Sequence, residues 1–295
     1  MSKVAIFWDP NGIELDSLGS KQFLRATDGD TPYVAMSIRM LSIDTPELHY
    51  PANQKPSKMD DKLAELAEWL RQGKSQVDDH LAAYLYPKLA TGRAGTLHEQ
   101  QGQQAMQALQ ALVDEKLKLG NGKHRSVFLR VADQPFDDYG RVLAYVAPNY
   151  SPEERATLNR MERATFNLLM VANGWAAPFP VYPSLPQHLD LTLLHDAAET
   201  AFNEGRGAWA DANMLTGYEF RMCVKLYDVT KKLVASGGRF RESNPSWISR
   251  YCVDMTTREI YYPQEYIKVL PYNRIFVWPN DVSEAVSRLN LTPGG

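Results

Sequence analysis

The order in which strand-like and helix-like segments follow one another most constrains the fold of this chain. Short apolar runs typical of strands come first, between residues 3 and 43, and they stop before Pro46, which cannot continue a strand ladder. Segments with helical periodicity follow at about 60–118. Strands and helices then alternate to about residue 205, and strand-like runs return after about 213. This order predicts an α+β protein.

The length of the chain allows more than one folded part. With 295 residues, of which 44% are hydrophobic and 23% charged, the chain can bury one large core or two modest ones. We expect a main domain at 1–212 and a small β-rich C-terminal appendage at 213–295. Residues 50–97 are expected to form a helical hairpin inserted into the main domain, because their apolar residues recur at helical spacing.

Charge and cysteine content exclude several classes of protein. The formal net charge of -3 argues against a protein that holds nucleic acid through an overall basic surface, so any contact with nucleic acid must be local. Cys223 and Cys252 are too few for a disulfide framework, and we expect them to be reduced thiols in the core. The N-terminus lacks the apolar run of a signal peptide, which favours a cytoplasmic location and no membrane partner.

Acidic residues gather at two predicted strand ends. A hairpin that turns at Ser37 would place Asp30 opposite Asp44, with their side chains starting roughly 4.5 to 5.5 Å apart. Two facing carboxylates need a cation between them. Since no histidine or cysteine accompanies them, the oxygen ligands favour Ca²⁺ or Mg²⁺ over zinc.

A base and two arginines complete the candidate site. Glu47 lies three residues beyond Asp44, where it can take a proton from a water molecule. Arg39 and Arg141 supply fixed positive charge, and planar guanidinium groups match the non-bridging oxygens of a phosphodiester. This combination is typical of a phosphoryl-transfer centre.

Structural interpretations of the same residues stay open at this point. Asp28 precedes a glycine, and an Asp-Gly pair is more often a turn than a ligand. Arg39, in an apolar strand, needs a partner, which is either a phosphate or an ion pair with Glu47 or Asp44. The six histidines show no metal-ligand spacing, so each is expected at the surface or in the core.

Three ordered blocks, at 28–31, 39–47 and 137–145, resemble the catalytic motifs of the staphylococcal nuclease family. The run Tyr-Gly-Arg-x-Leu-Ala-Tyr in the third block and a later motif at 167–176 extend the resemblance. The second motif reaches into a helix that we expect from about residue 151 to Gly174. The resemblance covers about residues 22–211 without the insertion. The resemblance implies an OB-like five-stranded β-barrel with three helices and a single Ca²⁺ ion at its rim.

The resemblance also implies which residues hold the metal ion. Asp30 and Asp44 resemble the carboxylate ligands, and Thr45 resembles the residue that lends its backbone carbonyl oxygen. Calcium is the expected ion, with magnesium less favoured.

The remaining roles follow from the same resemblance. Glu47 resembles the general base that orients the attacking water, and Arg39 and Arg141 resemble the two phosphate-binding arginines. Tyr139 and Tyr182 fall where the family contacts its substrate. Together these residues predict a catalytic centre for phosphodiester hydrolysis.

The expected function is that of a Ca²⁺-dependent endonuclease that hydrolyses single-stranded DNA or RNA with little sequence specificity. The alternative is a catalytically restrained or inactive member of the family that binds nucleic acid or protein. The insertion at 50–97 follows the predicted base directly, so it can roof the site. A protein partner that binds through the insertion or the tail fits the same alternative.

Overall fold

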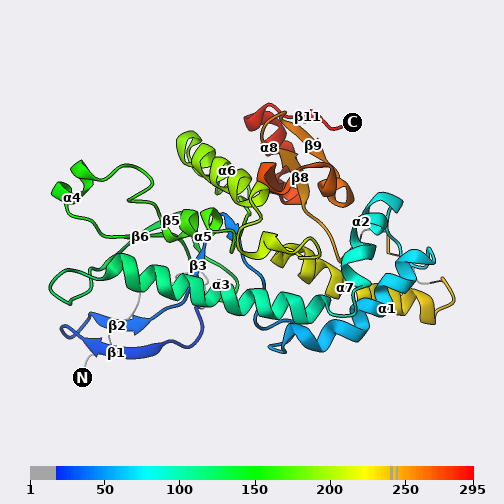
Figure 1. Cartoon of the computed structure of the whole chain (residues 1–295), viewed down its shortest axis with the longest axis horizontal. Helices are drawn as coiled ribbons and strands as arrows, with labels where there is room; N and C mark the ends of the chain where they lie inside the picture. Colours follow the sequence, from blue (N-terminus) through cyan, green and yellow to red (C-terminus); the bar gives the residue numbers. More distant parts are fainter. Residues whose placement is uncertain (1–17, 240–241, 244) are drawn as a thin grey trace, which may run out of the picture. The chain divides into compact units, whose positions relative to one another are not determined.

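The computed structural model describes residues 18–239, 242–243 and 245–295 (Figure 1). The first predicted strand, at 4–9, lies outside the described residues. The helices and strands together confirm a mixed α and β protein.

The described residues form two compact units. The first unit combines residues 18–39 with Val131–Ala144, and the second combines Met40–Arg130 with Tyr145–Gly295. The predicted insertion and the predicted appendage both belong to the second unit.

The α-helices are α1 (Asp60–Arg71), α2 (Asp79–Leu89), α3 (Ala94–Leu117), α4 (Pro152–Thr157), α5 (Phe166–Ala172), α6 (His188–Asn203), α7 (Gly217–Ala235) and α8 (Val282–Leu289). The strands are β1 (Gln22–Ala26), β2 (Pro32–Ala35), β3 (Ile38–Met40), β4 (Ile43–Asp44), β5 (Val127–Phe136), β6 (Val142–Pro148), β7 (Ala177–Pro178), β8 (Tyr251–Asp254), β9 (Glu259–Tyr261), β10 (Arg274–Val277) and β11 (Thr292–Pro293). Short 3₁₀ helices are η1 (Pro56–Met59), η2 (Gly207–Ala210), η3 (Pro263–Lys268), η4 (Pro271–Asn273) and η5 (Pro279–Asp281).

The strands pair in four separate sheets. Their orders are β1-β2, β3-β6-β5, β4-β7 and β10-β8-β9-β11. Among the described residues these sheets do not close into a barrel, so the five-stranded OB-like barrel stays a prediction that the family resemblance supports.

The predicted hairpin at Ser37 is wrong. Strand β2 pairs with β1, and β3 belongs to the sheet with β6 and β5. The turn lies instead at the Asp28-Gly29 signal, where the Thr27 N–H donates to the Thr31 carbonyl at 3.1 Å. The reason is local, because an Asp-Gly turn closes a short hairpin more readily than a turn at Ser37. Asp30 therefore lies in the β1-β2 turn and not in a strand paired with Asp44.

The helical hairpin predicted for residues 50–97 is confirmed by α1 and α2, which pack against each other. Leu63, Leu66 and Leu70 of α1 are buried, as the periodicity predicts. The helices share an apolar core with α7 and with strands of the tail (Figure 1).

The appendage predicted as β-rich begins with a helix. Residues 218–229 were expected to form a strand, but they lie in the 19-residue helix α7. A capping box starts this helix: the Glu219 N–H donates to Thr216 Oγ1 at 3.2 Å, and the Thr216 N–H donates to Glu219 Oε2 at 3.0 Å. The tail does contain strands, because β8 to β11 form its four-stranded sheet.

The insertion and the tail are held together by aromatic and polar contacts. The rings of Trp69 on α1 and Tyr227 on α7 stack with their centroids 5.4 Å apart. The Tyr227 hydroxyl donates to Glu65 at 2.8 Å. The insertion therefore packs on the tail and helps to fix the position of α7.

The single helix expected between residues 151 and 174 is also interrupted. Helix α4 ends at Thr157, and α5 begins at Phe166. Thr165 starts the second helix by accepting a hydrogen bond from the Leu168 N–H at 3.1 Å. This second cap explains the interruption, since a residue that caps a helix has extended backbone angles.

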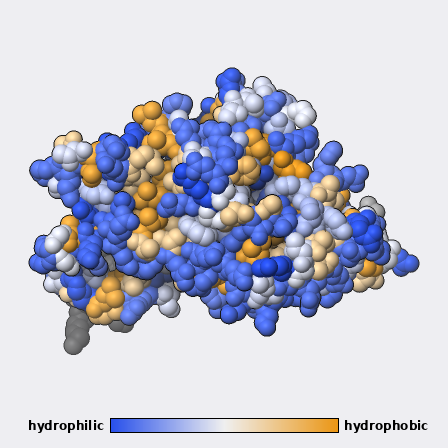
Figure 2. Space-filling model, in the orientation of Figure 1, coloured by the Kyte–Doolittle hydropathy of each residue, from blue (hydrophilic) through white to orange (hydrophobic). Residues whose placement is uncertain are grey.

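The described surface is mixed in polarity. On the face shown in Figure 2, hydrophilic residues surround smaller groups of apolar ones. In the part of the chain that the structure describes, no helix combines the length and the apolar character needed to cross a membrane.

We expect Thr216→Ala to lower the free energy of unfolding by about 1 kcal/mol, because the first turn of α7 loses its side-chain cap. Chemical denaturation measures this change. Thr192→Ala is the matched control, since Thr192 is exposed within α6 and caps no helix start. Equal effects of the two substitutions would contradict the capping role.

Candidate active site

Asp44 is a buried acid of the second unit. It ends β4, which pairs with β7 so that Asp44 lies opposite Ala177. The Phe179 N–H donates to the Ser42 carbonyl at 2.7 Å and fixes the same segment. Asp44 is only 1% exposed. A buried carboxylate of this kind requires a positive partner.

Arg221, on the first turns of α7, is that partner. Its Nη2 lies 3.1 Å from Asp44 Oδ1 and 3.0 Å from Oδ2. Its Nη1 donates to Glu47 Oε1. One guanidinium group therefore bridges the predicted metal ligand and the predicted base. Burial disfavours the charged guanidinium, but the attraction of Asp44 and Glu47 outweighs burial and raises the pKa of Arg221.

The start of α7 lies directly against the loop that follows β4. A Cβ atom on Gly217 would lie 2.6 Å from Asp44 Oδ2 and closer still to the Thr45 carbonyl oxygen. Only glycine permits this approach. The first turn of α7 therefore covers two of the three predicted metal ligands.

His98 and Gly102, both on α3, hold the backbone of Glu47. The Glu47 N–H donates to His98 Nε2 at 2.8 Å. The imidazole is buried and stacks on the Phe220 ring with centroids 4.1 Å apart. Gly102 lets α3 approach the Glu47 carbonyl, because a Cβ atom there would lie 2.8 Å from that oxygen. Burial lowers the pKa of His98 to about 3, so the ring is neutral and accepts this hydrogen bond.

The structure brings together three of the predicted residues, namely Asp44, Thr45 and Glu47, but with an arginine between the acids. Calcium requires six to eight oxygen ligands at roughly 2.3 to 2.6 Å. Both Asp44 oxygens instead face the Arg221 guanidinium, and a divalent ion beside it would meet like charge. Within the described ranges, no group of three or more His, Cys, Asp or Glu side chains could hold a metal ion. In this conformation the site fits the guanidinium and does not fit calcium.

Other predicted residues lie in the first unit. Asp30, in the β1-β2 turn, is exposed, and its Oδ1 accepts from Thr31 Oγ1 at 3.1 Å. Arg39 lies in β3 and is partly buried. The Arg141 Nε donates to Asp137 Oδ2 at 2.7 Å.

The two predicted substrate-binding tyrosines differ in exposure. Tyr139 is 80% exposed, and the Arg141 guanidinium lies 5.3 Å from its ring centroid. Tyr182 is buried in the apolar cluster that contains Ala285 of α8. Base stacking needs an exposed ring face, which Tyr139 offers in this conformation and Tyr182 does not. The substrate-binding roles of both tyrosines stay predictions.

Arg221 and His98 are the site residues that the sequence interpretation missed. The pattern Thr216-x-x-Glu219 before an apolar run is a capping-box signal, and it would have placed Arg221 on the first turns of a helix. No comparable signal marks His98, since its role depends on where α3 packs.

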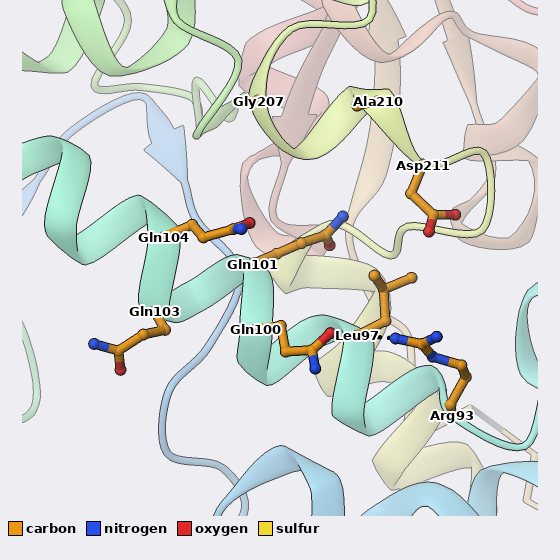
Figure 3. Close-up of a pocket in the computed structure, with 9 residues that line it drawn as sticks. All are labelled: Arg93, Leu97, Gln100, Gln101, Gln103, Gln104, Gly207, Ala210 and Asp211. Atoms are coloured by element: carbon orange, nitrogen blue, oxygen red, sulfur yellow. Dashed lines mark hydrogen bonds between the residues drawn. The ribbon is translucent and has the colours of Figure 1, made fainter.

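A separate open pocket of about 620 Å³ lies between α3 and residues 207–211 (Figure 3). Gln101 points from α3 toward this segment, and its Nε2 donates to the Ala208 carbonyl at 3.0 Å. The lining carries amides, Arg93 and Asp211, with no cluster of acids or of arginines. The carboxylates beside Arg221 are therefore the better candidate for phosphate chemistry.

A comparison with known protein families identifies the family of the chain. A family model described as staphylococcal nuclease homologue matches residues 37–211, more than half of the chain. The chain belongs to the staphylococcal nuclease family. A search of curated proteins found no match. The matched region of this staphylococcal nuclease homologue contains Asp44, Thr45 and Glu47, whereas Arg221 lies beyond its end. Arg221, which binds the carboxylates of Asp44 and Glu47, thus lies outside the residues that match the family model.

We expect the stability of the protein to fall as the pH drops below 6.5. In the unfolded chain His98 has a pKa near 6.5, whereas in the folded chain burial lowers its pKa to about 3. The neutral, buried His98 therefore contributes its full stabilisation above pH 6.5, and this stabilisation is lost as the pH falls toward 3. Between pH 6.5 and about pH 5.5 the free energy of unfolding should fall by about 1 kcal/mol. Unfolding free energies of wild type and His98→Gln across this range measure it.

The His98→Gln variant should show a flatter dependence on pH, because glutamine does not titrate. His80→Gln changes an exposed histidine and serves as the control. Parallel pH profiles of wild type and His98→Gln would contradict the assignment.

Proposed function

We propose that this member of the staphylococcal nuclease family is an endonuclease that hydrolyses phosphodiester bonds in single-stranded DNA or RNA with little sequence specificity. The observation that carries the proposal is the pairing of Asp44 and Glu47 around one cation. Both acids lie in the region that matches the family. In such a pair Glu47 can supply the base, and Asp44 can hold the cation whose positive charge phosphoryl transfer needs.

Glu47 is the proposed general base. Its carboxylate takes a proton from water, and the resulting hydroxide attacks phosphorus while the leaving oxygen departs on the opposite side. The hydrogen bond from its backbone N–H to His98 fixes the position of the residue. Arg39 and Arg141 are proposed to hold the non-bridging oxygens, roles that rest on the sequence resemblance.

Calcium is the proposed cofactor on the basis of the family resemblance. The carboxylate of Asp44 does not accept the ion while Arg221 is bound to it. Calcium-dependent activity therefore requires a conformation in which this ion pair is open.

The first test is the cleavage of a labelled single-stranded DNA and a matching RNA by wild type and Glu47→Gln. Each protein is assayed with calcium chloride, with magnesium chloride and with a chelator. We expect Glu47→Gln to lower the rate by about 10² to 10⁴, because the variant keeps the shape of the side chain and loses the base.

Glu115→Gln is the control for this assay, since it makes the same change at an exposed position of α3. Equal rates for Glu47→Gln and wild type would refute the role of Glu47.

A second candidate function is a nucleic-acid-binding module without catalysis, and the observation that favours it is the occupied Asp44 carboxylate. This candidate predicts salt-sensitive binding of single strands with no cleavage in any metal. Filter binding of the same labelled strands, measured beside the cleavage assay, separates the two functions.

A further inference from the structure

We propose that Arg221 is a built-in cation that blocks the metal position, so that docking of α7 and binding of calcium at Asp44 exclude each other. This inference rests on the proposed function, because it concerns the regulation of the same site. Its basis is the disagreement between the calcium expected from the family and the arginine found on the carboxylates.

The charges around Asp44 and Glu47 explain the exclusion. Two carboxylates and one guanidinium leave one net negative charge on the buried Asp44 and the partly exposed Glu47. A calcium ion carries twice the charge of the guanidinium, but both cations would need the same two carboxylate oxygens of Asp44. Since like charges at contact distance repel, one cation must leave before the other binds.

The shape of the docked helix reinforces the exclusion. Gly217 brings the first turn of α7 against the Thr45 carbonyl and Asp44 Oδ2, which are two of the three groups predicted to ligate the metal. Binding of a calcium ion to the Thr45 carbonyl oxygen requires space that this turn fills. Release of the site therefore involves movement of the start of α7 as well as a new conformation of the Arg221 side chain.

A buried network determines where α7 sits. Glu219, two residues before Arg221, is 1% exposed and receives a hydrogen bond from the Tyr84 hydroxyl at 2.8 Å. Lys88 Nζ lies 4.0 Å from its carboxylate, and Arg274 Nη1 lies 3.7 Å from it. Tyr84 and Lys88 belong to α2 of the insertion, and Arg274 belongs to β10 of the tail. The two segments outside the catalytic motifs thus hold the helix that blocks the site.

Calcium binding to the full chain, measured by isothermal titration calorimetry, tests this inference directly. We expect Arg221→Gln to bind calcium at least about tenfold more tightly than wild type if the docked form holds about 90% or more of the molecules. Lys225→Gln is the matched control, because it removes the same charge from an exposed position on α7. The double variant Arg221→Gln/Asp44→Ala should lose the gain.

Gly217→Ala provides a second route that leaves all charges in place. Alanine suits a helix, but its Cβ atom would collide with the Thr45 carbonyl and wedge the first turn of α7 away. We expect tighter calcium binding in this variant too. In the wild type, hydrogen exchange at residues 217–223 should rise on addition of saturating calcium.

Equal calcium affinity in wild type, Arg221→Gln and Gly217→Ala, or no calcium binding in any of them, would overturn the proposal. The cleavage assay with Glu47→Gln separates this failure from failure of the proposed function. If the variants gain calcium affinity but no protein cleaves, the block by Arg221 stands and the nuclease proposal falls. If wild type cleaves and the variants bind calcium no more tightly, the nuclease proposal stands and the block by Arg221 falls.

Discussion

The ion pair between Arg221 and the acids Asp44 and Glu47 is the interaction on which the rest of the site depends. Asp44 is buried at the end of a short strand, where an ionised carboxylate is stable only beside a cation. The chain supplies that cation from α7, almost 180 residues later in the sequence. The cation that holds the candidate site thus comes from a segment outside the part that matches the staphylococcal nuclease family.

The shared core of the insertion and the tail gives this arrangement its rigidity. Helix α1 packs against α7, where Trp69 stacks on Tyr227, and the buried leucines of α1 and α2 belong to the same apolar cluster as α7. The contacts of Glu219 with Lys88 and Arg274 fix the position of α7 against α2 and β10. Apolar packing alone would let the helix shift along its neighbours. Removal of the insertion is therefore expected to release α7.

Several elements could be predicted from sequence because their signals are local. The leucines of α1 repeat at helical spacing, and the hairpin of α1 and α2 forms as that pattern predicts. Other predictions failed where two local signals competed. The apolar run at 218–229 has the composition of a strand, but the capping box of Thr216 and Glu219 starts a helix there. The turn expected at Ser37 forms instead at Asp28-Gly29.

The sequence by itself determined the family, the mixed α and β class, the helical insertion and the acids that carry the candidate chemistry, since each depends on residue types at fixed spacing. Only the tertiary structure decided what those acids bind. The contacts of Arg221 with Asp44 and of His98 with Glu47 join residues far apart in the chain. Such contacts follow from the packing of α3 and α7, and no spacing in the sequence encodes them.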